Sequence, residues 1–165
     1  MLSKNCFSKR FDISPHSYGL KPVAMGAHSH TKLLYHVVFA TKRRAPFLTE
    51  ENLPCIIADI ATKANVLGVD ILAMNGYIDH LHLLLRLAPD HKLSEIIGQL
   101  KGYSSHQNSE IRWQIGYSAF TLHEEIVPVV RKYIENQRAH HESMDYRGEI
   151  SQLRKFSKDS PWLWA

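Results

Sequence analysis

The chain has 165 residues, with a formal net charge of +4 and a sequence pI near 9.1. This length predicts one compact domain with its own core, and no apolar run is as long as a membrane span, which argues against a transmembrane protein. The basic excess is compatible with a polyanionic partner, but many basic proteins bind no nucleic acid, so charge alone does not decide the function.

The beginning of the chain differs in composition from the rest. The first 27 residues combine charged residues with Pro and Gly and contain no apolar stretch, so they do not have the pattern of a secretory signal. We therefore predict a flexible tail over residues 1–27 and a single domain over residues 28–165.

The first predicted element of that domain is a strand over Leu33 to Ala40, a run of β-branched and aromatic residues. The basic cluster Lys42-Arg43-Arg44 follows it, and is either a solvated loop or a contact for a phosphate backbone. A helix is predicted from Thr49 to Gly68, because apolar residues recur there at helical spacing and a glycine closes the segment.

Two strands joined by a tight turn are predicted next. Val69 to Met74 and Tyr77 to Leu87 have strand composition, and the Asn75-Gly76 dipeptide between them tolerates the positive φ angles of a two-residue hairpin turn. The second of these strands carries His80 and His82. Because side chains alternate along a strand, both imidazoles are expected on the same face.

The remaining pattern predicts a helix, a short strand and a last helix. An amphipathic helix begins at Leu93 and ends in a polar stretch. A strand is predicted over Ser118 to Leu122, and a third helix over Glu124 to about His141, with acidic residues in its first turn and basic residues near its end. Pro128 would bend this helix or delay its start.

This order of elements is that of an α+β fold. Strand, helix, strand, strand, helix and strand make the split βαβ arrangement of a ferredoxin-like sandwich with a four-stranded antiparallel sheet, followed by an additional C-terminal helix that carries Tyr133. Two helices would cover one face of the sheet. The strands look apolar on both sides, so the other face requires a third helix, a second subunit or a ligand.

Four residues point to a metal site beside a nucleophile. His80 and His82 share a face, and Tyr133 and Gln137 stand four apart on a helix, where side chains are neighbours. Neutral imidazoles and an amide oxygen suit Mn²⁺, or Mg²⁺ with waters, and zinc also fits by ligand softness. An ion with open positions can polarise and orient a phosphodiester for attack by Tyr133.

A phenol needs help to act as a nucleophile, since it is protonated at neutral pH. A metal or the cations Arg131 and Lys132 could supply it. Each piece also has an ordinary structural explanation, because a strand histidine pair can be hydrogen-bonded without metal and Tyr133 can belong to an amphipathic helix surface. The combination of the pieces therefore carries more weight than any one of them.

Taken in order, these segments resemble the small single-strand-specific tyrosine transposases of the HUH endonuclease superfamily, the IS200-like transposases of bacterial insertion sequences. The resemblance covers roughly Ser29 to the C-terminus. It rests on four segments: Tyr35 to Arg44, Asp79 to Leu84, Trp113 to Phe120, and Tyr133 to Gln137 followed by His140-His141.

The resemblance implies the chemistry. His80 and His82 would bind Mg²⁺ or Mn²⁺ with Gln137 as third ligand, and Tyr133 would form a 5′-phosphotyrosine bond and free a 3′-hydroxyl. No nucleotide cofactor would be needed, because the covalent bond conserves the energy of the cleaved phosphodiester. The DNA-binding residues would be Lys42, Arg43, Arg44, Arg131 and Lys132.

The resemblance also implies partners and location. The substrate would be single-stranded DNA hairpins at the ends of the element, and the protein would be a homodimer in which the tyrosine helix acts in trans. It would be a cytoplasmic, nucleoid-associated bacterial protein without membrane contact. Two other functions remain open: a catalytically silent or domesticated hairpin-binding protein, and a ferredoxin-like RNA-binding domain, for which Tyr35 and Phe39 share a strand face.

Overall fold

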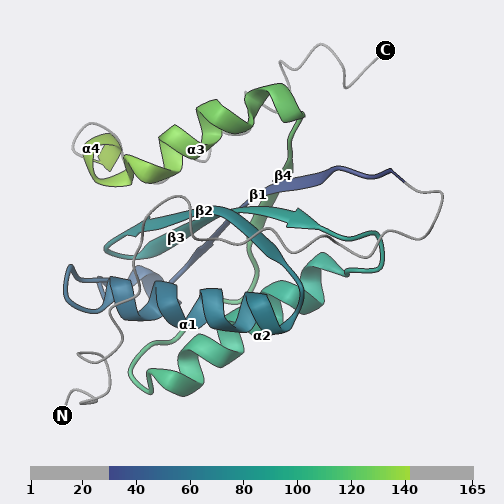
Figure 1. The fold of residues 1–165 in the computed structure, drawn as a ribbon. Coiled ribbons are helices and arrows are strands. Elements are labelled where there is room, and N and C mark those ends of the chain that lie inside the picture. The colour runs from purple at the N-terminus through teal and green to yellow at the C-terminus, as the bar shows by residue number, and fades with distance from the viewer. Residues whose placement is uncertain (1–29, 142–165) are drawn as a thin grey trace.

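The computed structural model describes residues 30–141 (Figure 1). The predicted tail over residues 1–27, and the part of the predicted domain beyond residue 141, lie outside the described residues. Between residues 30 and 141, no helix is both long enough and apolar enough to cross a bilayer. The elements are, in chain order, β1 (Leu33–Ala40), η1 (Lys42–Arg44), α1 (Leu53–Val66), β2 (Asp70–Tyr77), β3 (His80–Leu87), α2 (Leu93–Gln107), β4 (Ser118–Thr121), η2 (Glu124–Ile126), α3 (Val127–Glu135) and α4 (Gln137–His141).

The four strands form one antiparallel sheet in the order β2-β3-β1-β4. This is the strand order of the ferredoxin-like split βαβ sandwich, so the predicted fold class is confirmed. α1 and α2 lie together on one face of the sheet, and α3 and α4 lie on the opposite face (Figure 1). β1 and β3 are the two inner strands, and their side chains are therefore covered on both faces.

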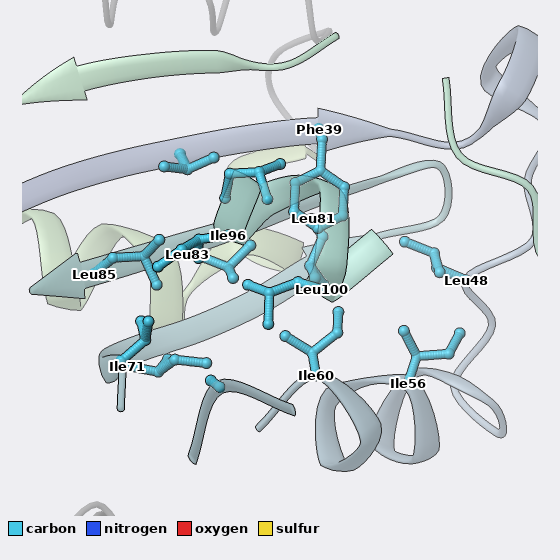
Figure 2. Close-up of a cluster of buried hydrophobic side chains, with 14 of the residues drawn as sticks. Phe39, Leu48, Ile56, Ile60, Ile71, Leu81, Leu83, Leu85, Ile96 and Leu100 are labelled. Carbon is cyan, nitrogen blue, oxygen red and sulfur yellow. The ribbon is translucent and has the colours of Figure 1, made fainter. Parts of the chain in front are cut away.

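The main core lies between the sheet and the layer of α1 and α2. Leu81, Leu83 and Leu85 of β3 are fully buried there, in one cluster with Ile60 of α1 and Leu100 of α2 (Figure 2). Burying each such side chain stabilises the fold by roughly 1.5–3 kcal/mol relative to leaving it exposed. The odd-numbered residues of β3 thus fix which face of this strand points into the core.

The second face of the sheet is covered by α3. Leu84 of β3 and Ala73 of β2 form a smaller buried cluster with Ile134 of α3. Because Leu84 has the opposite parity to the core leucines, the even-numbered residues of β3 face α3. The sequence analysis allowed a third helix, a second subunit or a ligand to cover this face. Within one chain, it is the third predicted helix, here α3, that covers it.

The hairpin between β2 and β3 turns later than predicted. Tyr77 pairs with His80, so the two-residue loop is Ile78-Asp79, and the prediction of an Asn75-Gly76 turn was wrong. Asn75 instead lies within β2, where its Nδ2 donates a hydrogen bond of 2.9 Å to the carbonyl oxygen of Glu135. Position 76 requires glycine because there is no room for a side chain: a Cβ there would lie 2.6 Å from the carbonyl oxygen of His80.

Replacing Gly76 by alanine should destabilise the fold. A contact of 2.6 Å with backbone cannot be relieved without moving β3, and such overpacking typically costs about 1–3 kcal/mol. The free energy of unfolding, from urea titration, measures this. Gly102→Ala is the matched control: Gly102 lies in α2 with nothing within 4 Å of an added Cβ, so a gain of about 0.5–1 kcal/mol is expected. Equal stability of the two variants would contradict the close approach.

The predicted third helix from Glu124 to His141 is divided. A 3-10 turn, η2, precedes α3, and Pro128 occupies the first turn of α3, where a missing N–H costs little. Asn136 then separates α3 from α4 with φ −98° and ψ 24°. The Asn136 side chain donates to the carbonyl oxygen of Lys132 at 2.9 Å, and such local bonds compete with helix continuation.

Candidate active site on the α3 face of the sheet

His80 and His82 lie side by side on β3 and face α3. Both are 0 % exposed, and their ring centroids are 5.0 Å apart. The predicted shared face is therefore present in the structure. Because β3 is an inner strand whose odd-numbered leucines point into the main core, the histidines cannot turn away without exposing that core.

His36 of β1 is a third buried imidazole that sequence reasoning missed. Its Nε2 lies 2.9 Å from Nδ1 of His82, at hydrogen-bonding distance, and it is 1 % exposed. The register explains the contact, because Val38 pairs with His82 and His36 stands two residues earlier on the same face. The only signal in the sequence was a polar residue at an inward position of an otherwise apolar strand.

Asp79 orients His80 from the hairpin turn. Its Oδ1 lies 2.7 Å from His80 Nδ1, and its Oδ2 pairs with Arg44 at 2.8 Å. Partial burial works to raise the pKa of Asp79, but the hydrogen bond to His80 and the charge of Arg44 outweigh it, so the pKa is lowered. The ionised carboxylate can only accept a hydrogen bond, so it requires a proton on His80 Nδ1, which leaves the lone pair of the ring on Nε2.

Tyr133 of α3 stands over the histidines. Its ring centroid is 5.9 Å from that of His82 and 6.1 Å from that of His36, both edge-on. The ring is half-buried and packs against Val38, as does Phe120. The tyrosine and the histidine pair therefore meet within one chain, on one face of the sheet.

Gln137 opens α4, one turn beyond Tyr133, and is 0 % exposed. Its Nε2 has a long contact of 3.5 Å to the carbonyl oxygen of Tyr133. Its Oε1 is buried and has no hydrogen-bond partner among residues 30–141. A buried amide oxygen without a partner costs free energy, and a cation bound there would remove that cost.

The residues present fit a divalent ion. His36 and Asp79 each engage a Nδ1 nitrogen, the arrangement in which neighbouring groups hold ligating imidazoles in position. Gln137 adds a hard oxygen, as Mg²⁺ and Mn²⁺ favour. Within residues 30–141, no three His, Cys, Asp or Glu side chains stand as a ready-formed metal-binding group, so the histidine pair needs at least one further ligand, and the Gln137 amide can supply it.

The predicted DNA-binding residues separate into three groups. Lys42 and Arg43 line a pocket of about 330 Å³ together with Arg112, a cation that sequence reasoning did not single out. Arg44 turns toward Asp79 instead. On α3, Lys132 is exposed and Arg131 is half-buried.

The basic turn η1 has an unusual backbone. Arg43 and Arg44 adopt φ angles of 59° and 57°, in the left-handed region that non-glycine residues rarely occupy. Thr41 supports this turn, because its hydroxyl donates to the carbonyl oxygen of Ala45 at 2.7 Å and its own carbonyl accepts from the Arg44 N–H at 3.0 Å. The turn sends Arg43 to the pocket and Arg44 to the histidine site.

Comparison with known proteins identifies relatives of this chain. The family model described as "Transposase IS200 like" matches residues 29–137. The ISDra2 transposase TnpA of Deinococcus radiodurans is 28% identical over 121 residues, covering 64% of this chain and 84% of that protein. The transposase for insertion sequence element IS200 of Salmonella typhimurium is 33% identical over 79 residues, covering 48% of this chain and 52% of that protein.

Solved structures agree with the family match. A Deinococcus radiodurans R1 protein assigned as a transposase superimposes with a TM-score of 0.57 at 27% identity, covering 70% of this chain and 98% of that one. A REP-associated tyrosine transposase, solved bound to a REP hairpin, superimposes with a TM-score of 0.55 at 18% identity, covering 71% and 74%, and this likeness concerns the fold. From the family match over residues 29–137, the chain belongs to the IS200-like transposase family, and its activity is that of a transposase.

Proposed function

We propose that this transposase cleaves and rejoins single-stranded DNA at hairpin-marked element ends, with Tyr133 as the nucleophile and His80, His82 and Gln137 as ligands of Mg²⁺ or Mn²⁺. The observation that carries the proposal is the meeting of Tyr133 with the buried histidine pair, 5.9 Å from His82 between ring centroids. A phenol beside two imidazoles held by Asp79 and His36 has the composition of a nucleophile next to a cation site.

The proposed reaction exchanges one phosphodiester bond for another, so it needs no nucleotide cofactor as an energy source. The Tyr133 oxygen attacks the scissile phosphorus, and its proton passes to solvent. The new bond is a 5′-phosphotyrosine, and the bond from phosphorus to the 3′ oxygen breaks, so that this oxygen takes up a proton as a 3′-hydroxyl. A bound divalent ion would polarise the phosphate and neutralise its charge. Attack by a 3′-hydroxyl reverses the step and rejoins the strand.

The buried setting of the site supports this role. His80, His82 and Gln137 are each 0 % exposed, and electrostatic interactions are stronger where water is excluded. The Asp79 carboxylate holds the His80 ring in position, and Arg44 forms an ion pair with the same carboxylate. The chain's own residues thus position the ligands before a substrate arrives.

The decisive experiment is a search for a covalent intermediate. The purified protein is incubated with single-stranded oligonucleotides that carry hairpins from the sequence flanking its gene, with Mn²⁺ or Mg²⁺ or with a chelator, and run on a denaturing gel. A protein–DNA band that requires metal is expected. DNA that is bound but never cut, with either ion, would favour a catalytically silent or domesticated hairpin-binding protein.

The basic turn is proposed to hold the DNA backbone. Removing Lys42 and Arg43 together should weaken hairpin binding and reduce its salt dependence, by about 0.7 to 0.9 in the logarithmic slope for each phosphate that the variant no longer neutralises. Binding titrations at several salt concentrations measure this. Lys92→Ala is the matched control, because Lys92 is exposed at the start of α2 and pairs with Glu95 at 2.9 Å. An unchanged slope in the double variant would exclude η1 from the DNA interface.

We further propose, from the resemblance, a homodimer in which the tyrosine helix of one copy serves the histidines of the other. Mixing Tyr133→Phe with His82→Ala protein should then restore cleavage, since each heterodimer holds one complete site. Each variant alone is the control, and pull-down of a tagged copy verifies that subunits exchange. Verified exchange without restored cleavage would assign the tyrosine to its own chain's histidines, as the contacts of Tyr133 within one chain allow.

A further inference from the structure

His141, at the end of α4, reaches back to the histidine pair. Its Nε2 lies 3.0 Å from Nε2 of His80, and the ring centroids are 4.6 Å apart. Its ring stacks on Tyr77 of β2, with centroids 4.5 Å apart and an interplanar angle of 11°. The position of this imidazole is therefore fixed by packing, and its nitrogen meets the nitrogen of His80 that faces away from Asp79.

The spacing of the two nitrogens matches that of two ligands of one ion. With metal–nitrogen bonds of about 2.0–2.1 Å, two ligands stand about 2.9 Å apart at a right angle and about 3.4 Å apart at the tetrahedral angle. The observed 3.0 Å falls within this range. In the absence of metal, the same distance suits a hydrogen bond from a His141 N–H to the lone pair of His80 Nε2, whose tautomer Asp79 sets.

We propose that His141 is a further ligand of the divalent ion, joining His80, His82 and Gln137. This inference rests on the metal site of the proposed function and adds a third imidazole to it, one that contacts His80 in the structure but does not yet form a three-histidine metal-binding group with His82. Three nitrogen ligands favour Co²⁺, Zn²⁺ and Mn²⁺ over Mg²⁺, which prefers oxygen. The choice of metal ion would therefore depend on His141 of α4 as well as on the two strand histidines, His80 and His82.

The connection between α3 and α4 makes this contact possible. A continuous helix from Val127 would carry residue 141 along the α3 axis, whereas the break at Asn136 redirects the last five residues. The break is tied to the sheet, because Asn75 Nδ2 donates to the carbonyl oxygen of Glu135 at 2.9 Å. Both Asn75 and Tyr77 lie on β2, so one strand positions the start and the end of α4.

The test measures metal binding directly, without DNA. Co²⁺ and Mg²⁺ are titrated into full-length wild type, His141→Ala and His141→Gln, with the visible absorption of Co²⁺ and calorimetry as readouts. Because even residues that only support a ligand change metal affinity about 10–100-fold, we expect His141→Ala to lose at least about tenfold in Co²⁺ affinity. The Co²⁺ spectrum should also change, while Mg²⁺ affinity changes less.

Two controls separate the possible failures. His123→Ala removes an imidazole that is exposed near η2, and should leave Co²⁺ binding as in wild type. His82→Ala should abolish binding. Loss in His82→Ala with an unchanged titration and spectrum in His141→Ala would overturn the role of His141 alone, whereas unchanged binding in His82→Ala would overturn the metal site itself.

Discussion

Replacing Tyr133 by phenylalanine should abolish DNA cleavage while hairpin binding is retained. The variant keeps the ring that packs against Val38, and removes only the oxygen that would attack phosphorus. Loss of a covalent nucleophile lowers turnover by about 10⁴-fold or more, so no covalent protein–DNA band should form. Because the ring packing is retained, the variant should fold, and a cooperative melting transition checks this.

The measurement compares adduct formation with binding in the same samples. A denaturing gel reports the covalent product, and a native gel with the same hairpin oligonucleotide reports the complex. Tyr117→Phe is the matched control, since Tyr117 is exposed just before β4, and it should cleave as wild type does. Undiminished adduct in Tyr133→Phe would show that another residue attacks, and the proposed mechanism would fall.

Replacing Gln137 by methionine should have opposite effects on stability and activity. Methionine keeps a long side chain but removes a buried Oε1 that has no hydrogen-bond partner among residues 30–141. An unsatisfied buried polar group costs about 1–3 kcal/mol, so the metal-free variant should be more stable by about 1 kcal/mol. Without the amide oxygen, metal affinity and metal-dependent cleavage should both fall strongly.

Chemical denaturation in the presence of a chelator measures the stability change, and the same titration with saturating Mn²⁺ measures the contribution of the ion. Wild type should gain more stability from Mn²⁺ than Gln137→Met, because only an ion that binds the folded state shifts unfolding. Asn108→Leu is a useful contrast, since Asn108 Nδ2 donates to Asp59 at 2.8 Å and its loss should destabilise. Lower stability of metal-free Gln137→Met would contradict this prediction, because it would mean that the Gln137 amide oxygen has a hydrogen-bond partner in solution.

Local periodicity was sufficient to predict most of the framework. The run of Leu33 to Ala40 matches β1, and the alternation that put His80 and His82 on one face holds because buried leucines occupy the other parity. Tyr133 is on the predicted last helix. These features depend on repeats within one segment, which sequence displays directly.

Features that depend on contacts between segments were missed. Asn75-Gly76 has the composition of a turn, but Gly76 is required where β3 approaches closely, and this approach is set by pairing with β3. The helix break depends on Asn136 bonding to Lys132. His36 joins the site only through the register of β1 against β3. Propensity within a window carries no information about such neighbours.

The placement of the histidines on an inner strand constrains how the hairpin can change in length. Inserting a single residue within β3, between His82 and Leu83, would put the two histidines on the same face as Leu83 and Leu85, so that either the imidazoles would enter the layer of α1 and α2 or these core leucines would face α3. A change of two residues restores the parity. Viable length variants of this hairpin, in engineered libraries or among relatives, should therefore differ by even numbers of residues within the strand.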